Sequence, residues 1–160
     1  MSLVVQKYGG TSVGDAGKIK NVASRIAKRR GQGDDLVVVV SAMGKSTDQL
    51  ISLAREISEQ PAARELDVLL STGEIVSSTL MVMALQELGV EAISLSGAQA
   101  GIGTEARYGR ARILSIDTSE AEKIPGVKAV ITHGFFLVLL LCLLLLLPNA
   151  PKRLYAQIFC

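Results

Sequence analysis

Residues 4–14 read VVQKYGGTSVG, an apolar run that ends in a lysine, an aromatic residue and two glycines. Glycines cost conformational entropy on folding and leave no side chain to pack, so a strand would be more stable without them. The pattern therefore predicts a strand over 3–8 followed by a loop that needs bare backbone. Residues 18–30 carry apolar side chains at helical spacing, which makes the order strand, glycine loop, helix.

The same alternation continues along the chain. LVVVVS at 36–41 is a β-branched run, typical of a parallel strand that is covered on both faces. A second loop, AMGKSTDQL, opens a helix over 47–58, where Ser46 and Gln49 have the spacing of a capping box. After Pro61 we expect helices over 62–71 and 74–88, strands over 91–96, 111–117 and 127–132, and a short acidic helix over 119–123. This order predicts a three-layer α/β/α sandwich on a mostly parallel sheet.

Composition limits the function classes. A chain of 160 residues, 49% hydrophobic, predicts one domain with a real core. The net charge is +2 without a basic block, and the chain has three Tyr, three Phe and no Trp, so nucleic acid is not an expected partner. Two cysteines make no disulfide framework, and no leader of the secretory kind precedes the first predicted strand. We therefore expect a cytoplasmic protein.

The glycine loops lie where an open α/β sheet binds ligands, beyond the carboxyl ends of its strands. Glycines allow a phosphate to approach main-chain N–H groups, and Lys7 would add a cation. The spacing matches neither a P-loop, whose lysine follows the glycines, nor the dinucleotide fingerprint. Two interpretations stay open from the residues alone: a different phosphate-binding geometry, or an ordinary strand-to-helix turn beside a solvated lysine.

Several ordered segments resemble the aspartate kinases of the amino-acid kinase superfamily. These are VVQKYGGTSV, VVVVSAMGKSTDQL at 37–50, LDVLLSTGEIVSSTLM at 66–81, LSGAQAGIGTEARYGRARI at 95–113 and VITHGF at 130–135. The resemblance covers residues 1–135. It implies the superfamily's sandwich fold, use of ATP with Mg²⁺, and transfer of the γ-phosphoryl group to the side-chain carboxylate of L-aspartate, the first step toward lysine, threonine and methionine.

The resemblance also implies roles for single residues. Lys7 is the expected catalytic cation, because phosphoryl transfer depends on positioning and charge stabilisation. Thr47 and Glu74 are the expected contacts to L-aspartate, Glu74 through the ammonium group; the alternatives are a helix N-cap for Thr47 and a first-turn carboxylate for Glu74. No metal ligand is assigned. The expected nucleotide contacts are Lys7, Tyr8, Gly9, Gly10 and Ser41.

For other polar residues, a structural role explains the sequence at least as well as a functional role. His133 is the single histidine, which is weak support for catalysis. Arg107, Arg110 and Arg112 are candidates for steering an anionic substrate, or for a solvated loop or subunit contact. Asp67 is expected on a helix beside the site, where it orients neighbours.

Residues 136–160 form an atypical leucine-rich apolar tail in which the Leu-Gly-Arg-Gly-Gly-Ser-Asp signature expected from the resemblance does not occur. The apolar run over 135–147 is shorter than the roughly 20 residues that span a bilayer, so we expect a helix that collapses onto the sheet rather than a membrane segment. Two functions stay open: an aspartate kinase, with a glutamate-type kinase as its rival, or an inactive fragment that associates through its tail. Homo- or hetero-oligomers fit either.

Overall fold

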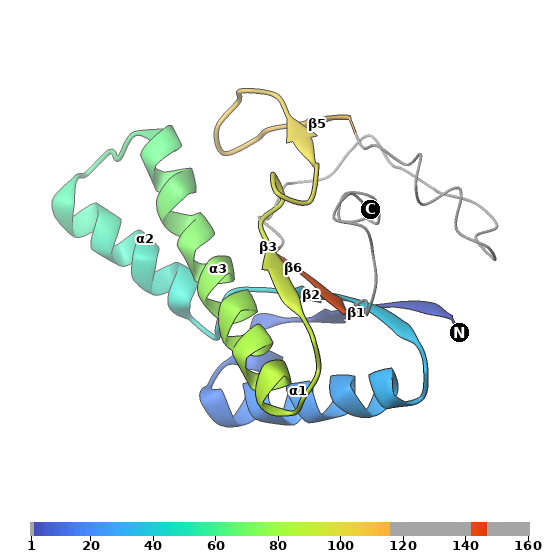
Figure 1. Ribbon diagram of the computed structural model, residues 1–160. Helices are drawn as coiled ribbons and strands as arrows, with labels where there is room; N and C mark the ends of the chain where they lie inside the picture. Colours follow the sequence, from blue (N-terminus) through green and yellow to red (C-terminus); the bar gives the residue numbers. More distant parts are fainter. Residues whose placement is uncertain (1, 116–141, 147–160) are drawn as a thin grey trace.

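The computed structural model describes residues 2–115 and 142–146 (Figure 1). Its main sheet has four strands in the order β1, β2, β6, β3. A two-stranded pair, β4 and β5, lies on the far side of this sheet from helix α1 (Figure 1). The strands are β1 Leu3–Tyr8, β2 Asp35–Val40, β3 Ile93–Leu95, β4 Gly103–Thr104, β5 Ile113–Ser115 and β6 Cys142–Leu146.

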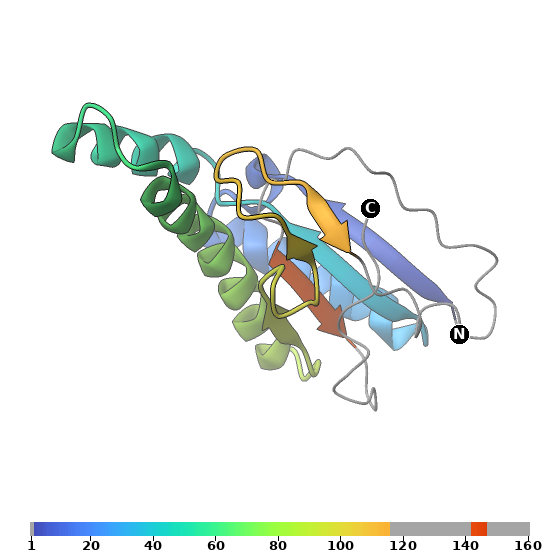
Figure 2. The ribbon, with the colours of Figure 1, turned by 90° about the horizontal axis from the view of Figure 1, so that it is seen from above.

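In the described part of the chain, three α-helices accompany the sheet: α1 (Ala16–Gly31), α2 (Ser46–Ile57) and α3 (Ala63–Glu87). A short 3-10 helix, η1 (Gly10–Val13), lies between β1 and α1. Among the described helices, α1 and the second half of α3 pack on one face of the sheet, and α2 pairs with α3 beyond the sheet (Figures 1 and 2). The α/β class is confirmed, and the described residues contain two layers of the expected three.

The first strand, loop and helix form as the sequence predicts. Strands β1 and β2 pair in parallel from Leu3 opposite Asp35 to Tyr8 opposite Val40. Helix α1 begins at Ala16, two residues before the expected start, because the Asp15 side chain caps it by accepting the Lys18 N–H at 2.8 Å.

The core lies between the sheet and the two helices that cover it. Residues alternate along a strand between its two faces, and Leu36, Val38 and Val40 of β2 point into this core. The helices supply apolar residues at helical spacing, namely Ile19, Val22, Ala23, Ile26, Met81, Val82 and Leu85. Lys7 pairs with Val39, so it belongs to the opposite face of the sheet from this core.

The expected break between helices at 71–74 is wrong, because α3 runs unbroken through it. The hydroxyls of Ser71 and Thr72 donate to the carbonyls of Val68 and Leu69 at 2.6 Å, so the polar residues are satisfied inside the helix. Gly89 ends the helix as expected, with φ of +72° and the Val90 N–H bonded to the Leu85 carbonyl.

The expected capping box at the start of α2 is also wrong. The N-cap is Lys45, which makes no side-chain cap bond, and its carbonyl accepts the Gln49 N–H. Helix α2 already includes Ser46 and Thr47, so neither residue serves as its N-cap.

The apolar tail contributes a strand where we expected a helix. Cys142–Leu146 forms β6, which lies between β2 and β3 and is antiparallel to both. Strand formation satisfies the backbone groups of two neighbouring strands at once, which outweighs leucine's preference for helices. The strand expected at 127–132, the helix at 119–123 and His133 lie outside the described residues.

Helix α3 is also the one described helix that is long and apolar enough to cross a membrane. Its residues Ser77, Met81 and Leu85 are fully buried against the rest of the protein. A core helix of this kind passes the same test of length and composition, so α3 is weak evidence for a membrane protein.

Candidate functional site

Two glycine loops meet at the carboxyl ends of β1 and β2. We call them loop 1 (residues 9–14) and loop 2 (residues 41–45). The Gly44 N–H donates to the Gly10 carbonyl at 3.0 Å. A Cβ on Gly10 would lie 2.5 Å from the Ala42 carbonyl oxygen, which no side chain tolerates. Gly44 has φ of +51°, a left-handed conformation that favours glycine. The glycines of both loops are therefore needed for one close contact between backbones.

Lys7 places its ammonium group above loop 1. The side chain is exposed, and its Nζ lies 3.6 Å from where a Cβ on Gly9 would be. The bare backbone of Gly9 and the ammonium group thus face the same space. An anion with several oxygens, such as a phosphate, fits this combination of a cation and open main chain.

The middle of α3 closes the site on one side. A Cβ on Gly73 would lie 3.1 Å from the Ala42 Cβ and 3.7 Å from the Ser46 Oγ. A glycine inside a helix costs about 1 kcal/mol relative to alanine, and here it lets α3 approach loop 2 and the start of α2. Glu74 follows it directly and is brought to the same place.

Glu74 is a buried carboxyl group with 6% of its surface exposed. Burial raises its pKa, while hydrogen bonds from its own N–H and the Ala42 N–H act in the opposite direction. In the part of the chain that the structure describes, no lysine or arginine forms an ion pair with it. A cationic ligand bound beside Glu74 would therefore stabilise the charged form of its carboxyl group.

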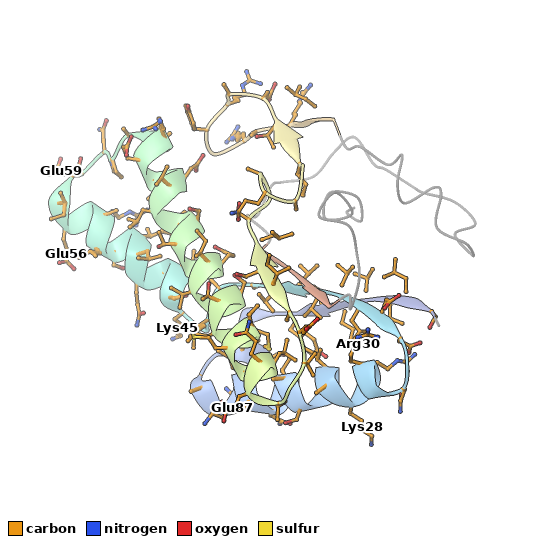
Figure 3. The ribbon with its side chains drawn as sticks, in the orientation of Figure 1. Lys28, Arg30, Lys45, Glu56, Glu59 and Glu87 are labelled. Atoms are coloured by element: carbon orange, nitrogen blue, oxygen red, sulfur yellow. The ribbon has the colours of Figure 1, made fainter. Side chains whose placement is uncertain are left out.

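The start of α2 supplies hydroxyl groups beside Glu74. The Ser46 Oγ is buried and has no hydrogen-bond partner among the described residues. Thr47, the next residue, is partly buried. Lys45 is exposed and lies at this end of α2, close to the sheet (Figure 3). Ser46 and Lys45 were not among the predicted site residues.

Ser41 and Tyr8 reach the site mainly through their backbones. The Ser41 N–H donates to the Tyr8 carbonyl at 3.1 Å, which extends the pairing of β1 and β2 by one bond. The Tyr8 ring packs against the core, and its hydroxyl donates to the Gln6 Oε1 at 3.0 Å. Burial raises the pKa of Tyr8, against a smaller opposite effect of Arg25. The Tyr8 side chain thus packs on the face of the sheet opposite Lys7.

Several of the predicted site residues form one cluster, and the others lie around it. Loop contacts bring Gly9, Gly10 and Ser41 together, Lys7 lies above Gly9, and Gly73 brings Glu74 to the start of α2. Sequence reasoning missed Ala42, Gly44 and Gly73, whose small size allows these approaches. Repeated small residues after each strand were the available signal for Ala42 and Gly44, whereas Gly73 lies inside α3.

Asp67 lies on α3 as expected, and its Oδ2 accepts the Gly109 N–H at 2.7 Å. Arg107, Arg110 and Arg112 are all exposed in the loop that contains Gly109. The described residues contain no group of three or more histidine, cysteine, aspartate or glutamate side chains that could hold a metal ion.

Comparison with known families matches residues 2–139 to the amino acid kinase family. Aspartokinase 2 of Bacillus subtilis strain 168 is 57% identical over 136 residues, and the aspartokinase of Geobacillus stearothermophilus is 52% identical over 136 residues. Each alignment covers 84% of this chain and 33% of the relative. The chain thus spans about a third of the length of the curated relatives it matches.

Solved structures agree with this comparison. An aspartate kinase from Synechocystis superposes with a TM-score of 0.58 at 60% identity, over 61% of this chain and 17% of that one. Escherichia coli aspartokinase III, in complex with aspartate and ADP, superposes with a TM-score of 0.54 over 68% of this chain and 34% of that one. At 24% identity the second likeness supports the fold alone.

Proposed function

The chain belongs to the amino acid kinase family, and on that basis we propose that it supplies the amino-terminal part of an aspartate kinase, an enzyme that transfers the γ-phosphoryl group of ATP to the side-chain carboxylate of L-aspartate. Identity of 57% to an aspartokinase over 136 residues supports this choice of substrate. The proposal includes action in the cytoplasm, in line with a chain of two cysteines and no disulfide framework.

The observation that carries the proposal is the position of Glu74. A buried carboxyl group next to the phosphate-binding loops provides a partner for the ammonium group of an amino acid. An ammonium ion bound there stabilises the charged form of Glu74 and offsets its burial. Thr47 and Ser46 lie at the adjoining helix start and offer hydroxyl groups to the rest of the same ligand.

The phosphate end of the site fits ATP. Lys7 and the bare backbone of Gly9 and Gly10 face one space at the carboxyl end of β1. We propose that Mg²⁺ enters with the ATP phosphates, as it commonly does. When bound, Mg²⁺ supplies additional neutralisation of the phosphate charge.

The reaction is a displacement at phosphorus. A carboxylate oxygen of L-aspartate bonds to the γ-phosphorus as the bond to the β,γ-bridging oxygen breaks, and ADP leaves with that oxygen. Charge on the phosphoryl oxygens is stabilised by Lys7, whose exposed Nζ is free to follow them. Glu74 and Thr47 hold the amino acid so that its carboxylate meets the phosphorus.

A fusion tests this proposal. Residues 1–135 of this chain are joined to the remaining two thirds of Aspartokinase 2 of Bacillus subtilis, and aspartate-dependent ADP release is measured. We expect turnover, and we expect Lys7→Ala to lower kcat by about 10²- to 10³-fold, the usual cost of losing one charge-stabilising group. Unchanged kcat in the variant would remove Lys7 from the mechanism.

Substrate choice is tested in the same fusion. Glu74→Ala should raise the KM for L-aspartate and leave the KM for ATP nearly unchanged; a parallel rise in both would indicate a folding role. L-Glutamate replaces L-aspartate as the rival acceptor, and preference for it would identify a glutamate-type kinase. The 160-residue chain, assayed alongside, should release no more ADP than its Lys7→Ala variant, because the Leu-Gly-Arg-Gly-Gly-Ser-Asp signature that the resemblance implies for holding aspartate and phosphate does not occur in it.

A further inference from the structure

The loop between β4 and β5 is held in shape by hydrogen bonds between its two ends. Within this segment, Glu105–Arg112, the Glu105 N–H donates to the Arg112 carbonyl at 2.9 Å, and the Glu105 Oε1 accepts the Arg112 N–H at 3.3 Å. Gly109 has φ of +71°, and a Cβ there would meet nothing within 4 Å. Glycine is therefore required at this turn by backbone conformation and not by lack of space.

A hydrogen bond attaches this loop to the first turns of α3. The Asp67 Oδ2 accepts the Gly109 N–H at 2.7 Å, across 42 positions of sequence. Tyr108 of the loop also lies near Arg64, whose pKa is raised mainly by Glu65 and further by Tyr108. The carboxylate of Asp67 thus holds the turn at its glycine, between two arginines of the loop.

Asp67 and Glu74 lie on the same face of α3. Seven residues correspond to two helical turns less about 20°, and to a rise of about 10.5 Å. Since Gly73 and Glu74 face loop 2, Asp67 fixes the Glu105–Arg112 loop on the side of α3 that borders the site. Both views place this loop beside the first turns of α3 and on the side of the sheet away from α1 (Figures 1 and 2). Lys7 belongs to that same face of the sheet.

The loop is strongly basic for its length. It contains three arginines and one glutamate, and the side chains of Arg107 and Arg110 are exposed. A guanidinium group donates two parallel hydrogen bonds to a carboxylate, a geometry that lysine lacks. A loop fixed at its centre and bearing arginines on either side is suited to holding a dicarboxylate over the site.

We propose that the Glu105–Arg112 loop binds a carboxylate of the acidic substrate through Arg107 and Arg110, and that Asp67 is the residue that positions this loop. The inference rests on the proposed function, because it takes L-aspartate as the substrate. Asp67 acts through Gly109 and is a positioning residue; the arginines contact the ligand. Glu74 receives the ammonium group at the other end of the same face.

The test measures binding of L-aspartate, L-asparagine and ATP to the 160-residue chain by calorimetry. The double variant Arg107→Ala, Arg110→Ala should weaken L-aspartate binding about tenfold or more, the loss expected for one or two hydrogen bonds between charged groups. ATP binding should change less than about twofold, and the preference for L-aspartate over L-asparagine should disappear. Arg55→Ala, which removes an exposed arginine of α2, is the matched control and should change nothing.

Asp67 is tested by two substitutions. Asp67→Ala removes the acceptor for the Gly109 N–H and should reproduce the double arginine variant. Asp67→Asn keeps a side-chain oxygen that accepts this N–H and should restore most of the preference for L-aspartate. A role in general stability would weaken ATP binding as well and would give no difference in preference between the two substitutions.

The outcomes separate this inference from the proposed function. L-Aspartate binding that is indifferent to loss of both arginines overturns the loop's role and leaves the aspartate kinase proposal standing. A parent chain that binds ATP but not L-aspartate overturns both the loop's role and the amino-acid half of the site. A parent chain that binds neither ligand overturns both proposals. The double arginine variant alters exposed side chains only, so it decides the matter even if Asp67→Ala fails to fold.

Discussion

Glu74 is a buried ionisable residue, and its burial has a cost for the stability of the fold. Its carboxyl group is buried at the junction of α3 with loop 2, and burial raises its pKa. A group with a raised pKa in the folded state binds its proton more tightly there than in the unfolded chain. The contribution of Glu74 to the free energy of unfolding is therefore largest below the ordinary glutamate pKa and decreases as pH rises from about 4.3 toward the folded-state value.

Glu74→Gln should for this reason stabilise the free protein at pH 7 relative to the parent. Glutamine has no charge to lose on burial, and its carbonyl oxygen still accepts from the Ala42 N–H. Urea unfolding at pH 4 and pH 7 measures the effect: the parent should lose stability between the two values relative to the variant. Glu87→Gln, on an exposed residue of the same helix, is the control and should stay within about 0.5 kcal/mol of the parent. If Glu74→Gln is less stable than the parent at pH 7, the raised pKa of Glu74 is contradicted.

At the scale of elements, the two glycine loops act as one unit. The Gly44 N–H bonds to the Gly10 carbonyl, and the same backbones are so close that Gly10 has no room for a side chain. Helix α3 joins them through Gly73, which packs against Ala42. The position of Glu74 relative to Lys7 thus depends on close backbone contacts between elements far apart in the sequence.

Gly10→Ala should therefore destabilise the protein by about 1–3 kcal/mol, the usual cost of overpacking. The added methyl would lie 2.5 Å from the Ala42 carbonyl oxygen, and backbone must move to admit it. Thermal and urea unfolding measure the loss. Gly31→Ala, at the last residue of α1, is the matched control, because a Cβ there meets nothing within 4 Å; it should cause no loss. Equal stability of the two variants would show that the loops separate readily.

At the scale of the whole molecule, the order of strands is the main finding. Strands β1, β2 and β3 all run in one direction, and β6 enters between β2 and β3 in the other. Both neighbours of β6 lie within residues 2–139, which match the amino acid kinase family, whereas β6 itself follows them in the chain. The leucine-rich segment thus completes a sheet whose other strands come from the family fold.

The register of β6 predicts a specific cross-link. Val40 lies opposite Cys142, and residues directly opposite in antiparallel strands have Cα atoms about 4.5–5.5 Å apart, within the range of disulfides. In a Cys160→Ser background, Val40→Cys should form a disulfide with Cys142 under mild oxidation, detected by peptide mass mapping. Val39→Cys, which is paired with Leu143, should not form it. Equal cross-linking at both positions would refute this register, and a cross-linked dimer would show that β6 exchanges between two chains.

Part of this architecture follows from the sequence alone. Period and composition identify β1, α1 and β2, and glycines after each strand locate the ligand-binding edge, since local backbone preferences decide these features. Lys7, Tyr8, Gly9, Gly10, Ser41, Thr47 and Glu74 were named from motifs. Gly9, Gly10 and Ser41 lie in the two adjoining loops, and Lys7 lies near the end of β1, just before loop 1. Their catalytic and binding roles remain predictions.

Tertiary structure decided the rest. Residues 71–74 look like a helix boundary by composition, yet they stay helical because Gly73 packs against Ala42, a contact between segments 31 positions apart. The segment 142–146 has helical propensity but becomes a strand because β2 and β3 each offer it a row of backbone partners. The Asp67–Gly109 hydrogen bond likewise joins residues that no local pattern connects. Local sequence determines what each segment prefers, and long-range backbone contacts determine which preference prevails.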